Sequence, residues 1–214
     1  MNNDIEAKNQ SALESLAKND FYQAQITFRD NAKRNPCFIT LNNLGVFYVH
    51  EGIAMENGRM RSAVKQGIKL LVKAGSFRMS GSNLAAIARA YLKLNNFEMA
   101  TNYYDQAIKE MNNYALYNNC GVALYQVNQY EKASIYFSKA LDICPNHDEK
   151  LEIIISYAYA SLEIDKMQCN RIINDLTNAS DLSSQMLDIE KFVLLYLCDD
   201  FVSASVLLYM SSIG

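Results

Sequence analysis

Apolar and small residues recur along this chain at spacings of three and four, grouped around a short motif. The motif is a polar residue, an aromatic residue, two variable residues and an alanine. It occurs at 20–24, 96–100, 129–133 and 200–204, with weaker copies at 59–63 and 165–169. Four residues after the small residue comes a bulky one, at Phe28, Tyr104, Phe137, Ile173 and Leu208. This spacing predicts an amphipathic helix that begins after each polar residue.

The motif has a long period as well. Its small residues fall at 24, 63, 100, 133, 169 and 204, so successive copies lie between 33 and 39 residues apart. Such a period is typical of stacked helical hairpins. An Asp or Asn at the polar position would close the turn and can cap the second helix, and the alanine would let the two helices approach closely.

The stretch Tyr114–His147 carries the fullest copy. It resembles the tetratricopeptide repeat, a helix–turn–helix unit of about 34 residues with the signature Trp-x2-Leu-Gly-x2-Tyr, then Ala-x3-Phe, then Pro. The matching positions are Tyr117, Cys120, Gly121, Leu124, Ala133, Phe137, Ala140 and Pro145. Three of them replace one apolar residue by another, so the helical packing of the repeat is expected to be kept.

The resemblance implies an all-α fold, a right-handed superhelical solenoid of about six such hairpins in a single domain over 1–214. The units are expected at about 4–36, 38–80, 81–113, 114–147, 148–181 and 182–214. Unit two departs from the pattern, because extra residues around Gly52–Gly58 lengthen its connection. Its second helix also has Gly67 where a bulky residue is usual, which predicts looser packing there.

Composition agrees with an ordered helical protein. Half of the residues are apolar, a fifth are charged, and there are only two prolines and eight glycines. The sequence shows no apolar window long enough for a membrane span and no basic, apolar start typical of a secretory signal. Five cysteines without a Cys-x-x-Cys pair indicate reduced thiols. We therefore expect a cytoplasmic protein.

Signals for catalysis are absent from the sequence. The two histidines are His50, at the end of a first helix, and His147, predicted in a loop after Pro145. Neither stands at metal-ligand spacing from a second ligand, and no phosphate-binding, dinucleotide-binding or nucleophile motif occurs. The pair Asp199–Asp200 is interpreted as a turn with a helix cap. We predict no enzymatic activity, no metal and no cofactor.

In tetratricopeptide repeat proteins, the first helix of each unit lines the concave side of the superhelix. The resemblance therefore implies a groove lined by Asn42, Val46, Val49 and His50, by Ala85, Arg89, Leu92 and Lys93, and by Asn118, Val122, Tyr125 and Gln126. Apolar side chains mixed with hydrogen-bonding groups suit an extended peptide or a helix. Val46 and Val122 stand where chaperone-binding members carry a key Asn, which disfavours that subtype. Arg89 and Lys93 could bind an acidic side chain or a C-terminus, or could be solvated charges.

Charge is unevenly distributed along the chain. Residues 57–97 contain eight basic residues and no acidic one, whereas 148–214 contain eleven acids against four bases. A basic ridge with one cation every four residues is predicted along one helix, at Arg61, Lys65, Lys69 and Lys73. The ridge has four possible interpretations: a solvated helix face, a site for an acidic protein partner, a site for self-association with the acidic half, and a site for nucleic acid. A pI near 5.4 and a lack of interleaved aromatic residues make nucleic acid the weakest of these.

These features predict a non-catalytic adaptor or scaffold that holds a peptide or protein segment in its concave groove. One alternative is a regulatory module that senses a peptide and changes its superhelical pitch. Another is an anion or nucleic-acid binder that uses the basic ridge, which would show a steep dependence on salt.

Overall fold

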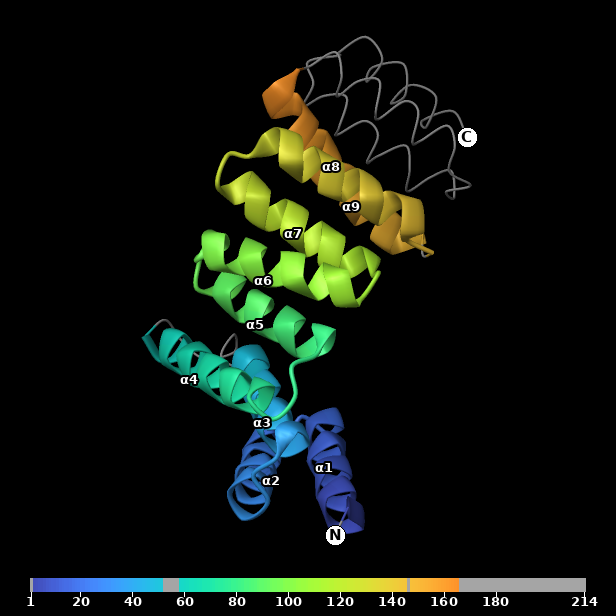
Figure 1. The fold of residues 1–214 in the computed structure, drawn as a ribbon. Helices are drawn as coiled ribbons and strands as arrows, with labels where there is room; N and C mark the ends of the chain where they lie inside the picture. Colours follow the sequence, from blue (N-terminus) through green and yellow to red (C-terminus); the bar gives the residue numbers. More distant parts are fainter. Residues whose placement is uncertain (1, 52–57, 146, 166–214) are drawn as a thin grey trace, which may run out of the picture. The chain divides into compact units, whose positions relative to one another are not determined.

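Antiparallel helical hairpins build the part of the chain that the computed structural model describes, residues 2–51, 58–145 and 147–165. Those residues form nine α-helices and no strand (Figure 1). The hairpins are α1 (Asn2–Ala17) with α2 (Phe21–Arg34), α3 (Phe38–Glu51) with α4 (Gly58–Gly75), α5 (Gly81–Lys93) with α6 (Phe97–Glu110), and α7 (Tyr114–Gln126) with α8 (Tyr130–Ile143). The helix α9 (His147–Ile164) follows. The predicted all-α repeat solenoid is confirmed.

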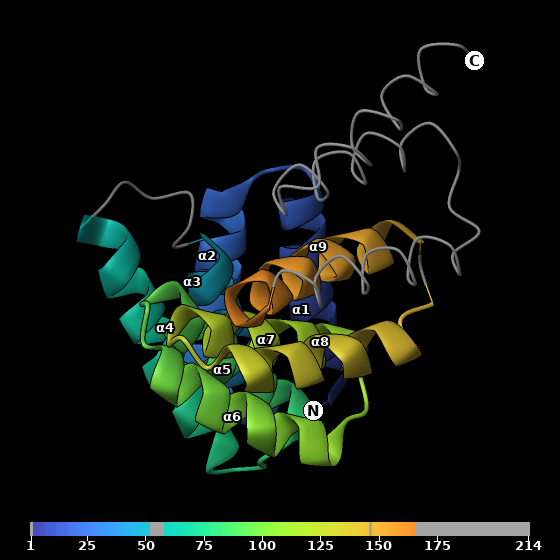
Figure 2. The ribbon, with the colours of Figure 1, turned by 90° about the horizontal axis from the view of Figure 1, so that it is seen from above.

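The chain divides into two compact units, 1–112 and 113–214. Within the first unit, α3 contacts both α1 and α5, so the first helices of successive hairpins lie next to one another. Within the second unit, α9 contacts α7 and α8 (Figure 2). The single domain over 1–214 stays a prediction. The predicted unit at 182–214, the end of the unit at 148–181 and the long connection at 52–57 lie outside the described residues.

The tight turns between paired helices share one backbone geometry. Asn19, Asn95 and Asn128 each occupy the left-handed region, with φ of 59°, 57° and 60°. After each Asn, the next backbone N–H donates to a carbonyl five residues earlier, at 2.8 Å in the first turn, 2.9 Å in the second and 3.0 Å in the third. This bond satisfies an unpaired carbonyl at the helix end, and Asn tolerates the left-handed conformation better than most residues.

Where an Asp or Asn follows one of these asparagines, it was predicted to cap the next helix. Asp20 accepts a hydrogen bond from the Gln23 N–H at 3.0 Å, and Asn96 accepts one from the Met99 N–H at 3.3 Å. The prediction is confirmed for these two residues. Gln129 makes no side-chain cap bond, so it closes its turn through the backbone alone.

Small residues mark the points where paired helices cross. Ala12, Ala24, Ala88, Ala100 and Ala133 are fully buried. A Cβ added to Gly121 would lie 2.7 Å from the ring of Phe137, which is itself buried. The ring therefore fills the space that a side chain at position 121 would need.

The looser packing predicted at Gly67 is wrong. A Cβ at position 67 would lie 2.8 Å from the carbonyl oxygen of Gly45 and 2.8 Å from Cγ2 of Val49. Two glycines thus face each other across α3 and α4, and the helices approach too closely for a side chain. Leu71, one turn further along α4, is fully buried and lies against Gly45, as Phe137 lies against Gly121.

The prediction of a loop at His147 is wrong. His147 is the first residue of α9 rather than part of a loop, because that helix begins directly after the short connection that follows Pro145. No helix among the described residues is long and apolar enough to cross a membrane.

Candidate binding faces

Two faces of the chain are formed by neighbouring first helices. The first is the α3–α5 face in unit 1–112, and the second is the α7–α9 face in unit 113–214. The residues predicted to line a groove are distributed over both.

Three cationic or titratable side chains converge on the α3–α5 face. Arg89 donates from Nη1 to Nε2 of His50 at 3.3 Å, since a guanidinium has no acceptor. Lys93 donates from Nζ to the Val49 carbonyl near the end of α3, at 3.2 Å. Burial, and then the charges of Lys93 and Arg89, lower the pKa of His50. The imidazole is therefore neutral at pH 7, and the two permanent cations carry the charge.

Other predicted members of this face serve packing. Val49 is only 2% exposed and Ala85 only 8%, so both belong to the core and are unavailable to a ligand. Val46 is half-buried against the apolar cluster that contains Val49. The prediction of Val49 and Ala85 as groove residues is wrong, because both side chains are buried. Val49 belongs to an apolar cluster with Val64 and Leu71 of α4.

A buried amide joins α3, α4 and α5. Asn83 is fully buried, and its Nδ2 donates to Oδ1 of Asn42 and to the Leu71 carbonyl, both at 3.1 Å. Asn42, predicted as a ligand-binding amide, is thus engaged in holding two first helices together. Sequence analysis missed Asn83, although a lone Asn in an otherwise apolar helical stripe is a signal for such a bond.

The α7–α9 face contains a pocket of about 320 Å³. Its lining combines three residues that were predicted for the groove, Val122, Tyr125 and Gln126, with Ser156 and Tyr159 from α9. Tyr159 is 40% exposed at the rim, and the Ser156 hydroxyl is used by its own helix, where it donates to the Glu152 carbonyl. Sequence analysis missed Ser156 and Tyr159, because unit five keeps too little of the repeat signature to set its register.

Tyr125 is the aromatic centre of this pocket. Its ring centroid lies 5.3 Å from that of Tyr130, with the two planes tilted by 59°. Burial raises the pKa of Tyr125, with smaller contributions from Glu163, Tyr130 and Tyr159. The phenol therefore stays protonated and can donate a hydrogen bond at neutral pH. Asn118, also predicted for the groove, is half-buried one turn before Val122.

A hydrogen bond links the beginnings of α7 and α9. Tyr114 bonds to the carboxylate of Glu149, and this bond raises the pKa of Tyr114 to about 12. Tyr114 is the first residue of α7 and Glu149 lies in the first turn of α9, so this bond joins the two helices where they start.

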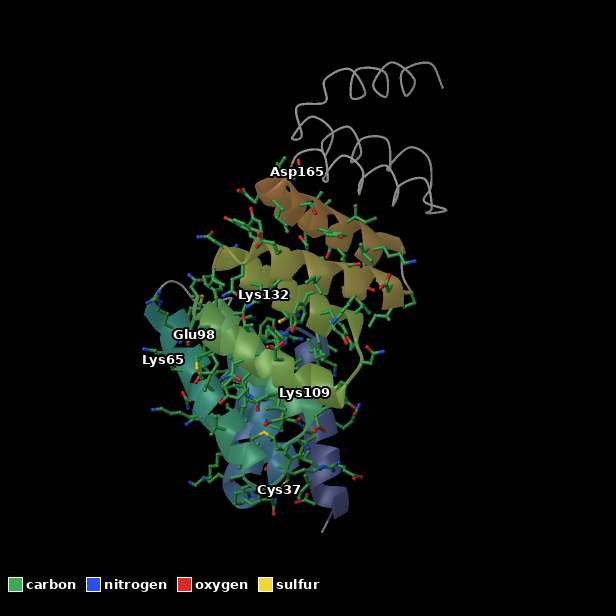
Figure 3. All side chains as sticks on the ribbon, turned by 45° about the horizontal axis from the view of Figure 1, so that its top comes forward. Cys37, Lys65, Glu98, Lys109, Lys132 and Asp165 are labelled. Carbon is green, nitrogen blue, oxygen red and sulfur yellow. The ribbon has the colours of Figure 1, made fainter. Side chains whose placement is uncertain are left out.

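The predicted basic ridge is a feature of α4. Arg61, Lys65, Lys69 and Lys73 are all exposed, and Figure 3 labels Lys65 at the outer edge of the helix. The ion pairs found among the described residues, Lys8 with Asp4 at 2.9 Å and Arg34 with Asp30 at 2.8 Å, do not involve the ridge. Over the same described part of the chain, no group of three His, Cys, Asp or Glu side chains could hold a metal ion.

Comparison with known families and structures gives one consistent result. Residues 82–110 and 114–147 each match sequence models of the tetratricopeptide repeat. No curated protein matches the chain.

Solved structures with the same fold have low sequence identity. A tetratricopeptide repeat protein from Parabacteroides merdae is 17% identical with a TM-score of 0.70, over 96% of this chain and 78% of that one. PilF from Pseudomonas aeruginosa is 15% identical with a TM-score of 0.69, over 98% of this chain and 91% of that one. YrrB, described as a tetratricopeptide repeat protein with an unusual peptide-binding site, is 13% identical with a TM-score of 0.61, over 78% of this chain and 81% of that one. The two sequence matches identify residues 82–110 and 114–147 as tetratricopeptide repeats, and these structures show that the chain shares the fold of tetratricopeptide repeat proteins.

Proposed function

We propose that this protein is a non-catalytic adaptor that binds an extended segment of a partner protein on its first-helix faces. One observation carries the proposal. Three residues nominated from the repeat register, Val122, Tyr125 and Gln126, line one pocket together with α9. Tetratricopeptide repeats form scaffolds for protein–protein interaction, and the structural relative YrrB is described as having a peptide-binding site.

The chemistry of the pocket suits a peptide. Val122 and the rings of Tyr125 and Tyr159 offer apolar contacts to one side chain of the ligand. The exposed amide of Gln126 offers both a donor and an acceptor, which matches the N–H and C=O of a peptide backbone. On the α3–α5 face, Arg89 and Lys93 would receive an acidic group of the partner. We place this activity in the cytoplasm, in line with the cysteine usage.

Selection of ligands from a displayed peptide library, followed by calorimetric titration, tests the proposal. We expect Tyr125→Ala and Val122→Asp each to weaken the selected peptide by about tenfold or more, because pocket contacts dominate such binding. Tyr22→Ala is the matched control, since Tyr22 is 75% exposed on α2 and lines no pocket described here. The proposal fails if the selected peptides bind Tyr125→Ala and Val122→Asp as tightly as the unaltered protein.

A further inference from the structure

A pocket with a basic rim lies between helices of the first unit, away from the residues that carry the proposed function. The pocket has a volume of about 370 Å³ and lies between α2, α3 and α4. The floor is apolar, formed by Leu41, Leu44 and Tyr48 of α3 with Leu70 of α4 at the side. Arg29 and Lys33 of α2 form one rim, and Gln66 of α4 forms the other.

The charge around this pocket is uncompensated. Asp30 also lines it, but its carboxylate accepts a hydrogen bond from Nε of Arg34 at 2.8 Å, so its charge is balanced by that residue. Arg29 and Lys33 are exposed and make no ion pair with any described residue. The rim on α2 therefore presents net positive charge to solvent.

The basic ridge extends this charge along α4. Lys69 follows Gln66 by three residues and Lys73 follows Leu70 by three, so helical periodicity places both lysines beside the pocket. Arg61 and Lys65 continue the row along the helix. Neighbouring ridge cations are four residues apart, which corresponds to about 6 Å along the axis. The basic rim on α2, the apolar floor and the ridge together form what we call the α2–α4 surface.

We propose that the α2–α4 surface docks an acidic amphipathic helix of a partner protein. A helix with a carboxylate every fourth residue repeats its charges at the same spacing of about 6 Å and so matches the ridge. An aliphatic side chain on the adjacent face of that helix would enter the apolar pocket. With the first-helix faces occupied separately, one chain could hold two partner segments at once.

Two other anionic partners fit the surface less well. A nucleic-acid backbone would use the cations but leave the apolar floor unfilled, and the chain as a whole carries a net charge of −3. An anionic lipid would need an apolar channel for its acyl chain, whereas this pocket has a volume of about 370 Å³, charged residues in its lining and the buried side chains of Leu41 and Leu44 as its floor.

Fluorescence anisotropy with a defined probe tests the proposal. The probe is a labelled helical peptide of about 18 residues with Glu at every fourth position and Leu on the adjacent face. Its counterpart carries Gln in place of every Glu, and a DNA duplex of about 20 base pairs represents nucleic acid. We expect the acidic peptide to bind at low salt, and the Gln counterpart to bind about tenfold more weakly or worse.

Charge-reversal variants locate the site. Arg29→Glu with Lys33→Glu, and separately Lys69→Glu with Lys73→Glu, are expected to weaken the acidic peptide by about tenfold or more. The matched control is Lys132→Glu with Lys139→Glu, which makes the same change of charge on exposed positions of α8 (Lys132 is labelled in Figure 3). That control is expected to change the affinity by less than about twofold.

Three results would overturn the inference: no binding of the acidic peptide at low salt, an equal loss in the α8 control, or tighter binding of the duplex than of the peptide. Tyr125→Ala separates this surface from the proposed function. It should leave the acidic peptide bound, and a loss there would place the peptide on the α7–α9 face instead.

Discussion

The α3–α5 and α7–α9 faces occupy the same place in the repeat and differ in chemistry. His50, Lys93 and Gln126 each lie five residues after the small crossing residue of their helix. The first two belong to a cationic cluster, and the third lies at the rim of an aromatic pocket. The backbone of the repeat decides where a side chain stands, and the residue type alone decides what it can bind.

The buried sides of these helices also differ in residue type between the two faces. Five residues before the crossing, α3 has Thr40, α5 has Asn83 and α7 has Leu116, and all three are buried. Thr40 donates to the Asn35 carbonyl at 2.6 Å, and Asn83 bonds to Asn42 and Leu71. Unit 1–112 is therefore held at this position by directed hydrogen bonds, whereas α7 relies on apolar packing.

Filling the closest helix crossing should give the largest effect. We expect Gly67→Leu to lower the free energy of unfolding by about 2–3 kcal/mol, because the added side chain meets the Gly45 backbone, which has no room to move aside. Urea denaturation measures this loss. Lys69→Leu, on the exposed side of the same helix, is the control and should change stability little. Equal stability of the two variants would contradict the close contact of α3 and α4.

Removing the buried amide should have the next largest effect. Asn83→Ala is expected to cost about 1–3 kcal/mol, because the Leu71 carbonyl loses a donor inside the core. The matched variant on the other face is Leu116→Ala, whose cost would come from lost apolar packing and a cavity. Adding Asn42→Ala to Asn83→Ala should lower the stability little further, since Asn83→Ala already removes the bond between the two amides. Fully additive losses from the two substitutions would show that this bond contributes nothing.

The cationic cluster should be visible in the titration of His50. Burial and the charges of Lys93 and Arg89 hold its pKa below the usual 6.5. Because the unfolded chain then binds more protons, stability from this group is present above pH 6.5 and falls as the pH drops below it. Imidazole proton shifts measured by NMR report the pKa directly, and His147→Gln identifies the signal. Arg89→Gln should raise this pKa, and a value at or above 6.5 in the unaltered protein would contradict the cluster.

The bond between Tyr114 and Glu149 should give the smallest effect, confined to the α7–α9 face. The phenol of Tyr114 is expected to ionise only near pH 12, because the carboxylate bond favours its protonated form. Glu149→Gln removes the charge and should lower this pKa. Carbon NMR of labelled tyrosine rings follows the ionisation, with Tyr114→Phe as the reference that assigns the signal. An unchanged pKa in Glu149→Gln would show that the bond does not form.

Over the described residues, periodicity was enough to predict helical hairpins stacked as a repeat, since these depend on local spacing and turn chemistry. It failed where a residue acts through a partner far along the chain. Gly67 looked like a defect until Gly45 was found opposite it, and Val49 looked accessible until the same contact covered it.

The pockets were beyond prediction for a related reason. Tyr159 comes from a helix without a readable signature, so its place beside Tyr125 depends on how α9 packs. The pocket of the α2–α4 surface draws residues from three helices and two repeats, and no single stretch of sequence contains its pattern.

The left-handed asparagines close each tight turn without help from neighbouring hairpins. The turns at Asn95 and Asn128 are closed by bonds within their own hairpins and lie 33 positions apart. A gene segment of that length could therefore be duplicated or exchanged with its turn intact. Such a cassette would carry its own row of outward-facing residues, so new specificity could be added to the chain by recombination rather than by redesign of the fold.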